Sequence, residues 1–222
     1  MVWRKRPIPE LSVMLTLGYR ISVMRPNRTA LLALILPIAA FGAGTSDAPR
    51  QQAEDVLLHP PFSAPFFTCG EHSGSLNFAL GDALGTDCVV QDFDLENKLL
   101  WARTHMADGS RNEDWYGWRA EVLAPCSCEV VKIHINETTN NPGKMIPGRA
   151  TSVTFRRTDG THVVYAHLRE IKVSEGQIVE AGEPVGKVGN NGYSRHPHVH
   201  IGAWKGEEPL QIRFDQYKMA PQ

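Results

Sequence analysis

The stretch DGTHVVYAHLREIKVSEGQIVEAGEPVGKVGNNGYSRHPHVHI, residues 159–201, decides the fold. It consists of short apolar runs separated by turn residues such as Glu175-Gly176. Residues 152–157 and 162–167 alternate apolar and polar side chains on either side of Asp159-Gly160, which predicts a β-hairpin. Further short runs with turns follow, and no long helical periodicity appears after residue 43. We therefore predict an all-β domain, an antiparallel sandwich or roll of short strands.

Three histidines lie close together near the end of this stretch, namely His196, His198 and His200. Side chains two residues apart on a strand face the same side, so His198 and His200 are expected to enter one cleft. Neutral imidazole is the commonest zinc ligand. An isolated His-x-His pair more often lies in a solvent-exposed turn than in a metal site. The surrounding residues are therefore needed to interpret this pair.

The residues around these histidines resemble the lysostaphin/LytM-type zinc metallopeptidases, peptidase family M23. The shared pattern is a Tyr-x-His-Leu strand, a series of spaced glycines and valines, and a Pro-His-x-His segment. The chain supplies it with Tyr165, His167, Leu168, Val173, Gly176, Val179, Gly182, Val185, Gly186, Gly189, Asn190, Gly192, Pro197, His198 and His200. The resemblance covers about residues 85–204. It implies a duplicated hybrid motif (barrel-sandwich hybrid) fold and a zinc enzyme that hydrolyses peptide cross-links of peptidoglycan.

The resemblance also implies roles for individual residues. His200, the second histidine of the Pro-His-x-His segment, would bind Zn2+. Asp92 would also bind Zn2+, because Asp92-Phe93 resembles the Asp-Phe pair of a subgroup with a long insertion. His198 would be the general base, and His167 would position the water or donate to the oxyanion and the leaving amine. The third metal ligand of the family is a histidine four residues before the aspartate, where this chain has Cys88.

Three states of Cys88 are compatible with the sequence. As a thiolate it would be a zinc ligand; it could instead form a disulfide with Cys69, Cys126 or Cys128, or stay a free buried thiol. The motif around it favours ligation by Cys88, Asp92 and His200, whereas an oxidising compartment favours a disulfide. The missing histidine raises an alternative function, a non-catalytic member of the fold that binds cell wall or activates an amidase.

The N-terminal part of the chain differs in composition from the rest. Residues 1–43 hold six basic side chains and one acidic one, which leaves 17 basic and 23 acidic residues in the remainder. An acidic body argues against nucleic-acid binding. Residues 30–41 are apolar, follow Arg28 and precede small residues, as in a signal peptide. We expect export to the periplasm or beyond, with no stable membrane insertion after cleavage. The expected segments are an over-extended start (1–23), the signal peptide (24–43), a linker or arm (44–66), the metallopeptidase domain (67–212) and a tail (213–222).

Overall fold

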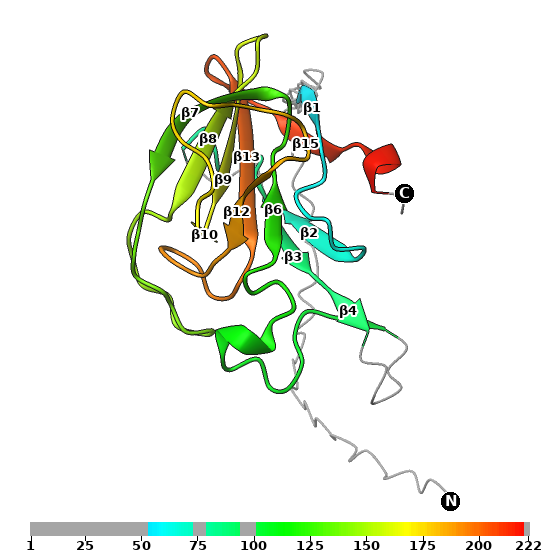
Figure 1. Cartoon of the computed structure of the whole chain (residues 1–222), viewed down its shortest axis with the longest axis vertical. Coiled ribbons are helices and arrows are strands. Elements are labelled where there is room, and N and C mark those ends of the chain that lie inside the picture. Colours follow the sequence, from blue (N-terminus) through cyan, green and yellow to red (C-terminus); the bar gives the residue numbers. More distant parts are fainter. Residues whose placement is uncertain (1–52, 73–78, 94–100, 220–222) are drawn as a thin grey trace, which may run out of the picture. The chain divides into compact units, whose positions relative to one another are not determined.

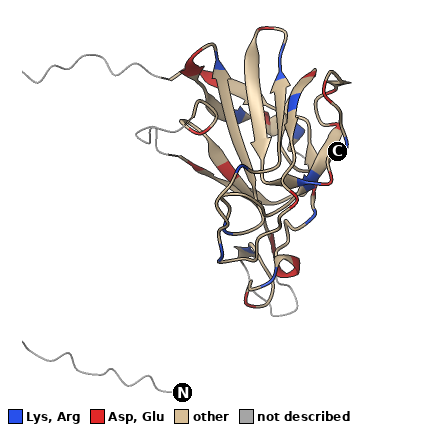
Figure 2. Cartoon of the chain, turned by 90° about the vertical axis from the view of Figure 1, so that its left-hand side faces the viewer, with Lys and Arg blue, Asp and Glu red and all other residues tan. Residues whose placement is uncertain are grey.

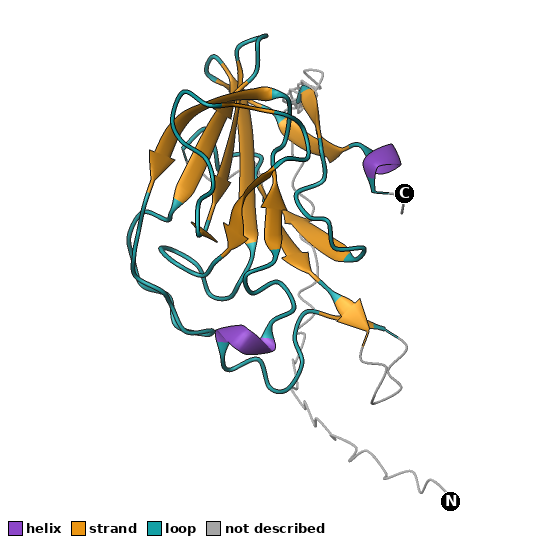
Figure 3. Cartoon of the chain, viewed as in Figure 1, coloured by secondary structure: helices purple, strands orange, loops and turns teal. Residues whose placement is uncertain are grey.

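Alternating apolar side chains place most of the chain in β-strands. A computed structural model describes residues 53–72, 79–93 and 101–219, so the expected start and signal peptide lie outside the described residues. Within these ranges there is no α-helix, and two short 3-10 helices, η1 (Asn112–Asp114) and η2 (Gln216–Lys218), accompany the strands (Figure 3). The predicted all-β class is confirmed.

The larger sheet carries the central strands of the molecule (Figure 1). The predicted hairpin across Asp159-Gly160 is present, and each strand of the path is antiparallel to its neighbours. In spatial order the strands are β11 (Ile178–Val179), β7 (Cys128–His134), β8 (Ser152–Arg156), β9 (Thr161–Ala166), β13 (Val199–Lys205), β3 (Thr86–Val90) and β2 (Phe67–Glu71), with β14 (Glu208–Pro209) paired to β13.

A smaller antiparallel sheet shares its core with the larger one. Its strands are β10 (Leu168–Arg169), β12 (Pro184–Val188) and β6 (Glu121–Leu123). Fully buried side chains of both sheets belong to one cluster, including Val122, Leu168, Val185, Val153, Phe155, Tyr165 and Ile201. Burying a Val, Leu, Ile or Phe side chain is worth about 1.5–3 kcal/mol, so this cluster joins the two sheets into one domain.

Two further strand pairs extend the domain. β1 (Asp55–Leu58) pairs in parallel with β15 (Gln211–Phe214), and β4 (Asp92–Phe93) pairs with β5 (Ala102–Arg103). Val56, Leu58 and Phe62 are buried in the core. Part of the segment expected as a linker or arm (44–66) is therefore a packed element, because its apolar side chains cover the end of the core.

Figure 2 shows that basic and acidic residues are interspersed along the chain of the domain. Glu170, for example, contacts Lys187 at 2.6 Å and Arg119 at 2.7 Å. Such exposed pairs contribute at most about 1 kcal/mol each. The stability of the domain therefore comes mainly from the apolar core.

Candidate metal centre

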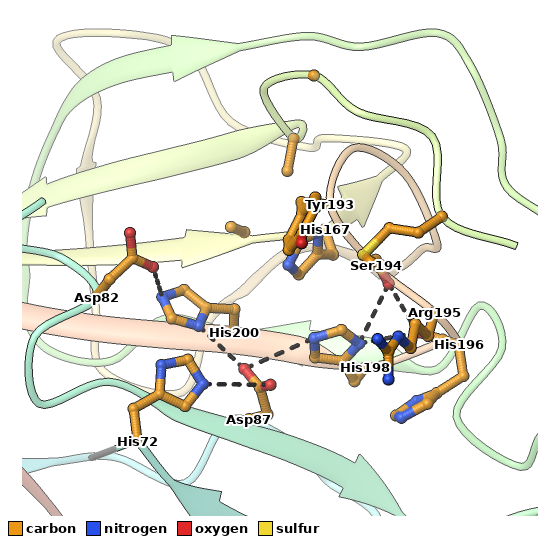
Figure 4. A pocket seen from close by; sticks show the side chains of 14 residues that line it. His72, Asp82, Asp87, His167, Tyr193, Ser194, Arg195, His196, His198 and His200 are labelled. Atoms are coloured by element: carbon orange, nitrogen blue, oxygen red, sulfur yellow. Dashed lines mark hydrogen bonds and ion pairs between the residues drawn. The ribbon is translucent and has the colours of Figure 1, made fainter. Parts of the chain in front are cut away.

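Strand register brings a histidine and a carboxylate together on two neighbouring strands of the large sheet. His200 on β13 lies directly opposite Asp87 on β3, and its Nδ1 atom is 2.9 Å from an Asp87 carboxylate oxygen (Figure 4). Neighbouring residues on a strand point to opposite faces. Val199 and Ile201 are therefore buried in the core, while His200 lines a pocket of about 550 Å³.

A third donor comes from the end of β2. His72 directly follows Glu71, which pairs with Thr86 on β3, and its Nε2 atom is 3.3 Å from the second oxygen of Asp87. One donor atom each from His72, Asp87 and His200 lies within 4.8 Å of the others. These three side chains, which point toward one another in Figure 4, form the candidate metal centre.

The turn before β3 closes the other side of the His200 ring. An Asp82 carboxylate oxygen and the Gly81 carbonyl oxygen each lie 3.1 Å from His200 Nε2. This approach requires glycine on the facing strand, because a side chain at Gly202 would overlap the Gly81 carbonyl. A Cβ atom at Gly85 would lie 2.8 Å from the His200 ring. Two glycines thus make room for the contact between the turn and the ring.

The two carboxylates set the charge of His200. Burial lowers the pKa of His200, but its hydrogen bonds to Asp82 and Asp87 outweigh burial and raise the pKa to about 9. Burial raises the pKa of Asp87, but the hydrogen bond to His200 and the charges of the nearby histidines hold that pKa well below its usual range. Asp87 is therefore ionised, and a metal ion would compete with the proton on His200.

His167 and His198 line the same pocket as neutral imidazoles. His167 Nδ1 is 2.8 Å from the Asn191 carbonyl oxygen, and His198 Nδ1 is 2.8 Å from the His196 carbonyl oxygen. A carbonyl only accepts, so each Nδ1 carries the proton and each Nε2 has a free lone pair. Burial is the main cause that lowers the pKa of His167 to about 3 and that of His198 to about 4.

A change of backbone conformation brings His167 into the pocket. The residue has φ of 63°, and β9 ends one residue earlier, at Ala166, which also lines the pocket. A regular strand would send these neighbours to opposite faces. Tyr165 is fully buried and packs edge-on against Phe155 at 5.6 Å between ring centroids, so it belongs to the core and not to the His167 face. The left-handed backbone conformation is energetically unfavourable for residues other than glycine, and residues that adopt it cluster at functional sites.

Two of the expected metal ligands, Cys88 and Asp92, lie outside the candidate centre in this structure. Cys88 is fully buried and forms a disulfide with Cys69, its cross-strand neighbour on β2. It points into the core because it is one residue from Asp87, and one step along a strand reverses the face. Asp92 lies beyond the end of β3, on exposed β4, where its carboxylate accepts a hydrogen bond from the Phe93 amide at 2.7 Å. Cys126 and Cys128 form a second disulfide.

Sequence reasoning missed His72, Asp82 and Asp87. Asp87 had a usable signal, since it is the charged residue in the otherwise apolar run TDCVV. His72 and Asp82 had none, because their proximity to His200 depends on the pairing of β2 with β3 and on the turn between them. His167 and His198 do converge with His200, at ring centroid distances of 6.2 Å from His167 to His200 and 4.6 Å between His167 and His198.

Comparison with known proteins identifies a family for the C-terminal part of the chain. Residues 117–212 match the profile described as Peptidase family M23. The chain carries a domain of peptidase family M23. The residues that match the family profile include His167, His198 and His200. The match begins after His72 and Asp87 in the sequence.

Curated relatives of the M23 domain match it over short stretches. It is 36% identical over 63 residues to the DD-carboxypeptidase/endopeptidase Mpg of Neisseria meningitidis, which covers 28% of this chain and 14% of that protein. It is 32% identical over 74 residues to the L-Ala–D-Glu endopeptidase of Bacillus subtilis, which covers 29% of this chain and 23% of that protein. The chain thus spans less than a quarter of the length of these relatives.

Solved structures of two peptidases are also similar to this chain. The catalytic domain of lysostaphin from Staphylococcus simulans has a TM-score of 0.40 and 18% identity, over 65% of this chain and 88% of that domain. A zinc-containing peptidase from Vibrio cholerae has a TM-score of 0.44 and 14% identity, over 77% of this chain and 40% of that one.

The residues of the candidate centre fit a zinc ion. Two imidazoles and one carboxylate are among the donor sets of catalytic zinc sites, which keep a fourth position open. Two ligands about 2.1 Å from one ion lie at most about 4 Å apart, and the donor atoms of His72, Asp87 and His200 lie within 4.8 Å of one another. Small side-chain movements would therefore bring all three to bonding distance.

Proposed function

We propose that this chain is an exported zinc endopeptidase that hydrolyses peptide cross-links of peptidoglycan. The observation that carries the proposal is the convergence of His72, Asp87 and His200 in one pocket that also contains two neutral histidines, His167 and His198. A metal centre beside neutral bases is what hydrolysis of a peptide bond needs.

The side chains of the pocket have different roles in the proposed reaction. A zinc ion on His72, Asp87 and His200 Nδ1 would act as a Lewis acid on the scissile carbonyl and make water more acidic. Asp82 holds His200 Nε2 and so fixes the orientation of the ring toward the centre. His198 Nε2 lies 3.6 Å from an Asp87 carboxylate oxygen, at the centre, where it accepts the proton of the attacking water.

His167 also contacts the attacking water in the proposed reaction, and its tautomer determines whether it accepts or donates a hydrogen bond. Because its Nδ1 proton is used on the Asn191 carbonyl, its Nε2 atom has a lone pair and no proton. In this state His167 accepts a hydrogen bond from the attacking water and orients it. It donates to the oxyanion or the leaving amine only after it has taken up a proton.

The substrate class comes from the relatives and is consistent with the pocket. The relatives named above are a DD-carboxypeptidase/endopeptidase and an L-Ala–D-Glu endopeptidase. In this chain the lining of the pocket includes Tyr193 and Arg195 from one loop and Met145 and Gly148 from another. A pocket lined by two separate loops accommodates an extended peptide between them, so we assign a peptidoglycan peptide as the substrate.

Export is part of the proposal because peptidoglycan lies outside the cytoplasm. The basic and then apolar N-terminal segment, residues 24–43, has the character of a signal peptide. The two disulfides are also typical of an oxidising compartment. Among the residues that the structure describes, no helix has the length and apolar character needed to cross a membrane.

Metal content and hydrolysis, measured together, test the proposal. The wild type should bind about one zinc ion per chain and clear purified peptidoglycan in a zymogram, and a chelator should abolish the clearing. His72→Ala and His200→Ala should lose zinc and activity, because each removes one of three metal ligands. His198→Ala should lose activity and keep zinc, because it removes only the base.

His162→Ala is a matched control. His162 stacks on Trp204 at 5.3 Å between ring centroids and does not line the pocket, so its removal should leave zinc content and hydrolysis unchanged. Clearing that is equally strong with chelator would contradict the zinc mechanism. A wild type that binds zinc but hydrolyses no peptidoglycan would support the alternative, a non-catalytic member of the fold that binds cell wall or activates an amidase.

A further inference from the structure

A buried network of polar side chains connects the 3-10 helix η1 to the loop that precedes His198. Asn112 on η1 uses both ends of its amide, since its Nδ2 donates to the Asn140 carbonyl at 2.8 Å and its Oδ1 accepts from Asn190 Nδ2 at 2.9 Å. Asn112 is 6% exposed, and Asn140 and Asn190 at most 1%. Because burial excludes water as a substitute partner, these bonds fix the position of the groups they join.

The network continues from Asn190 to the ring of His198. Ser194 Oγ lies 2.8 Å from Asn190 Oδ1, 2.9 Å from the His196 carbonyl and 3.3 Å from His198 Nδ1. The His196 carbonyl is the acceptor that determines the tautomer of His198. Asn112 is thus connected to the proposed base through two side chains, both of which are 1% exposed.

A second contact joins the same parts of the chain. Trp115, the residue that follows η1, stacks on His196 with ring centroids 4.6 Å apart and an interplanar angle of 6°. The indole Nε1 of Trp115 donates to the Gly109 carbonyl at 3.0 Å, which fixes the ring in its own segment. The segment around η1 is therefore attached to the His198 loop by a hydrogen-bonded network and by a ring stack.

We propose that Asn112 is a positioning residue that holds His198 in its base-competent orientation through Asn190 and Ser194. Asn112 lies before residues 117–212, the part of the chain that matches the family profile. A displacement of about 1 Å of a catalytic group can reduce the rate about a hundredfold. The inference rests on the proposed function in that His198 is taken as the base.

The test compares Asn112→Ala with a control asparagine. Asn136 also bonds at both ends of its amide, to the Arg149 carbonyl and from the Thr138 amide, but it forms no hydrogen bond with Asn190, Ser194 or His198. For Asn112→Ala in the zinc-loaded protein we expect a fall in kcat of about tenfold or more, with KM within about twofold and zinc content unchanged. For Asn136→Ala we expect wild-type kcat.

A spectroscopic measurement and a double mutant separate positioning from general destabilisation. In 15N NMR spectra of the imidazole rings, Asn112→Ala should shift or broaden the His198 signals and leave those of His162 unchanged. Ser194→Ala should have the same effect, and the double variant should be little worse than Ser194→Ala alone, because both act through one connection. Unchanged His198 signals in Asn112→Ala, additive losses in the double variant, or an equal loss in Asn136→Ala would overturn the proposal. The NMR measurement needs no turnover, so a wild type without hydrolysis would contradict the proposed function and leave this test valid.

Discussion

At the scale of single residues, the face on which a side chain lies decides its chemistry. Asp87 and Cys88 are neighbours on β3, yet one points to the pocket and the other to the core. The carboxylate contacts His72 and His200, and the thiol is consumed in a disulfide with Cys69. In the proposed centre His72, which directly follows β2, would supply the imidazole that the family resemblance placed at position 88.

Cys88→Ala and Cys88→His should therefore lower the free energy of unfolding, and neither should raise the affinity for zinc. Loss of a disulfide that closes a loop of this size costs about 3 kcal/mol in the free energy of unfolding, and an imidazole at position 88 would have to fit a fully buried site. Denaturant unfolding and zinc analysis check this, with Cys69→Ala as the control that removes the same bond. A gain in zinc affinity for Cys88→His above that of wild type would contradict the assignment.

At the scale of elements, the centre depends on close packing between β13 and the turn before β3. The Gly81 carbonyl and Asp82 reach His200 because Gly202 on β13 has no side chain. The same turn leads directly into β3, which carries Asp87. The packing of this turn and the positions of the proposed metal ligands are therefore linked at one point of the sheet.

Gly202→Ala should displace this turn and disturb the centre. Overpacking of a fitted site costs about 1–3 kcal/mol in the free energy of unfolding, and we expect zinc affinity to fall as the turn moves away from His200. Gly70→Ala is the matched control. Gly70 is also on a strand, and apart from its chain neighbours no described residue comes within 4 Å of the place that an added Cβ atom would occupy. Gly70→Ala should change stability by less than about 0.5 kcal/mol. Equal effects of the two substitutions would argue against this packing.

At the scale of the whole molecule, buried histidines couple global stability to pH. His167 and His198 have lowered pKa values in the folded protein, about 3 and about 4, so the unfolded chain binds more protons between about pH 4 and pH 6.5. Their contribution to stability therefore falls as the pH falls through this window. The pKa of His200 is raised to about 9, so its contribution is present below about pH 6.5 and is lost as the pH rises toward 9.

The metal-free protein should accordingly be most stable near neutral pH. At pH 5, unfolding should take up about two protons, one each for His167 and His198. Denaturant unfolding from pH 5 to pH 9 measures the slope of stability against pH. The double variant His167→Gln/His198→Gln should flatten the acid side of this curve and leave the alkaline side. A wild-type stability that is constant from pH 5 to pH 7 would contradict the buried neutral state of these two histidines.

The first strand also acts at the scale of the whole molecule. β1 pairs with β15, and Val56 and Leu58 thereby join the core. The proline-containing, polar surroundings of this strand suggested a linker. A strand of four residues is too short to be distinguished from a linker by its sequence pattern alone. Its identification requires the partner strand β15, which lies at the other end of the domain sequence.

The sequence by itself determined the local features of this protein. Period-two alternation and turn residues predicted the all-β class and the hairpin of β8 and β9, and the spacing of His198 and His200 placed both in one pocket, because these properties depend on neighbouring residues. Only the tertiary structure decided that His72 and Asp87 meet His200, that Cys88 pairs with Cys69, and that Asn112 reaches the His198 loop. Those contacts depend on which strands pair and in which register. A shift of one residue in register exchanges the two faces of a strand, and local sequence does not fix that choice.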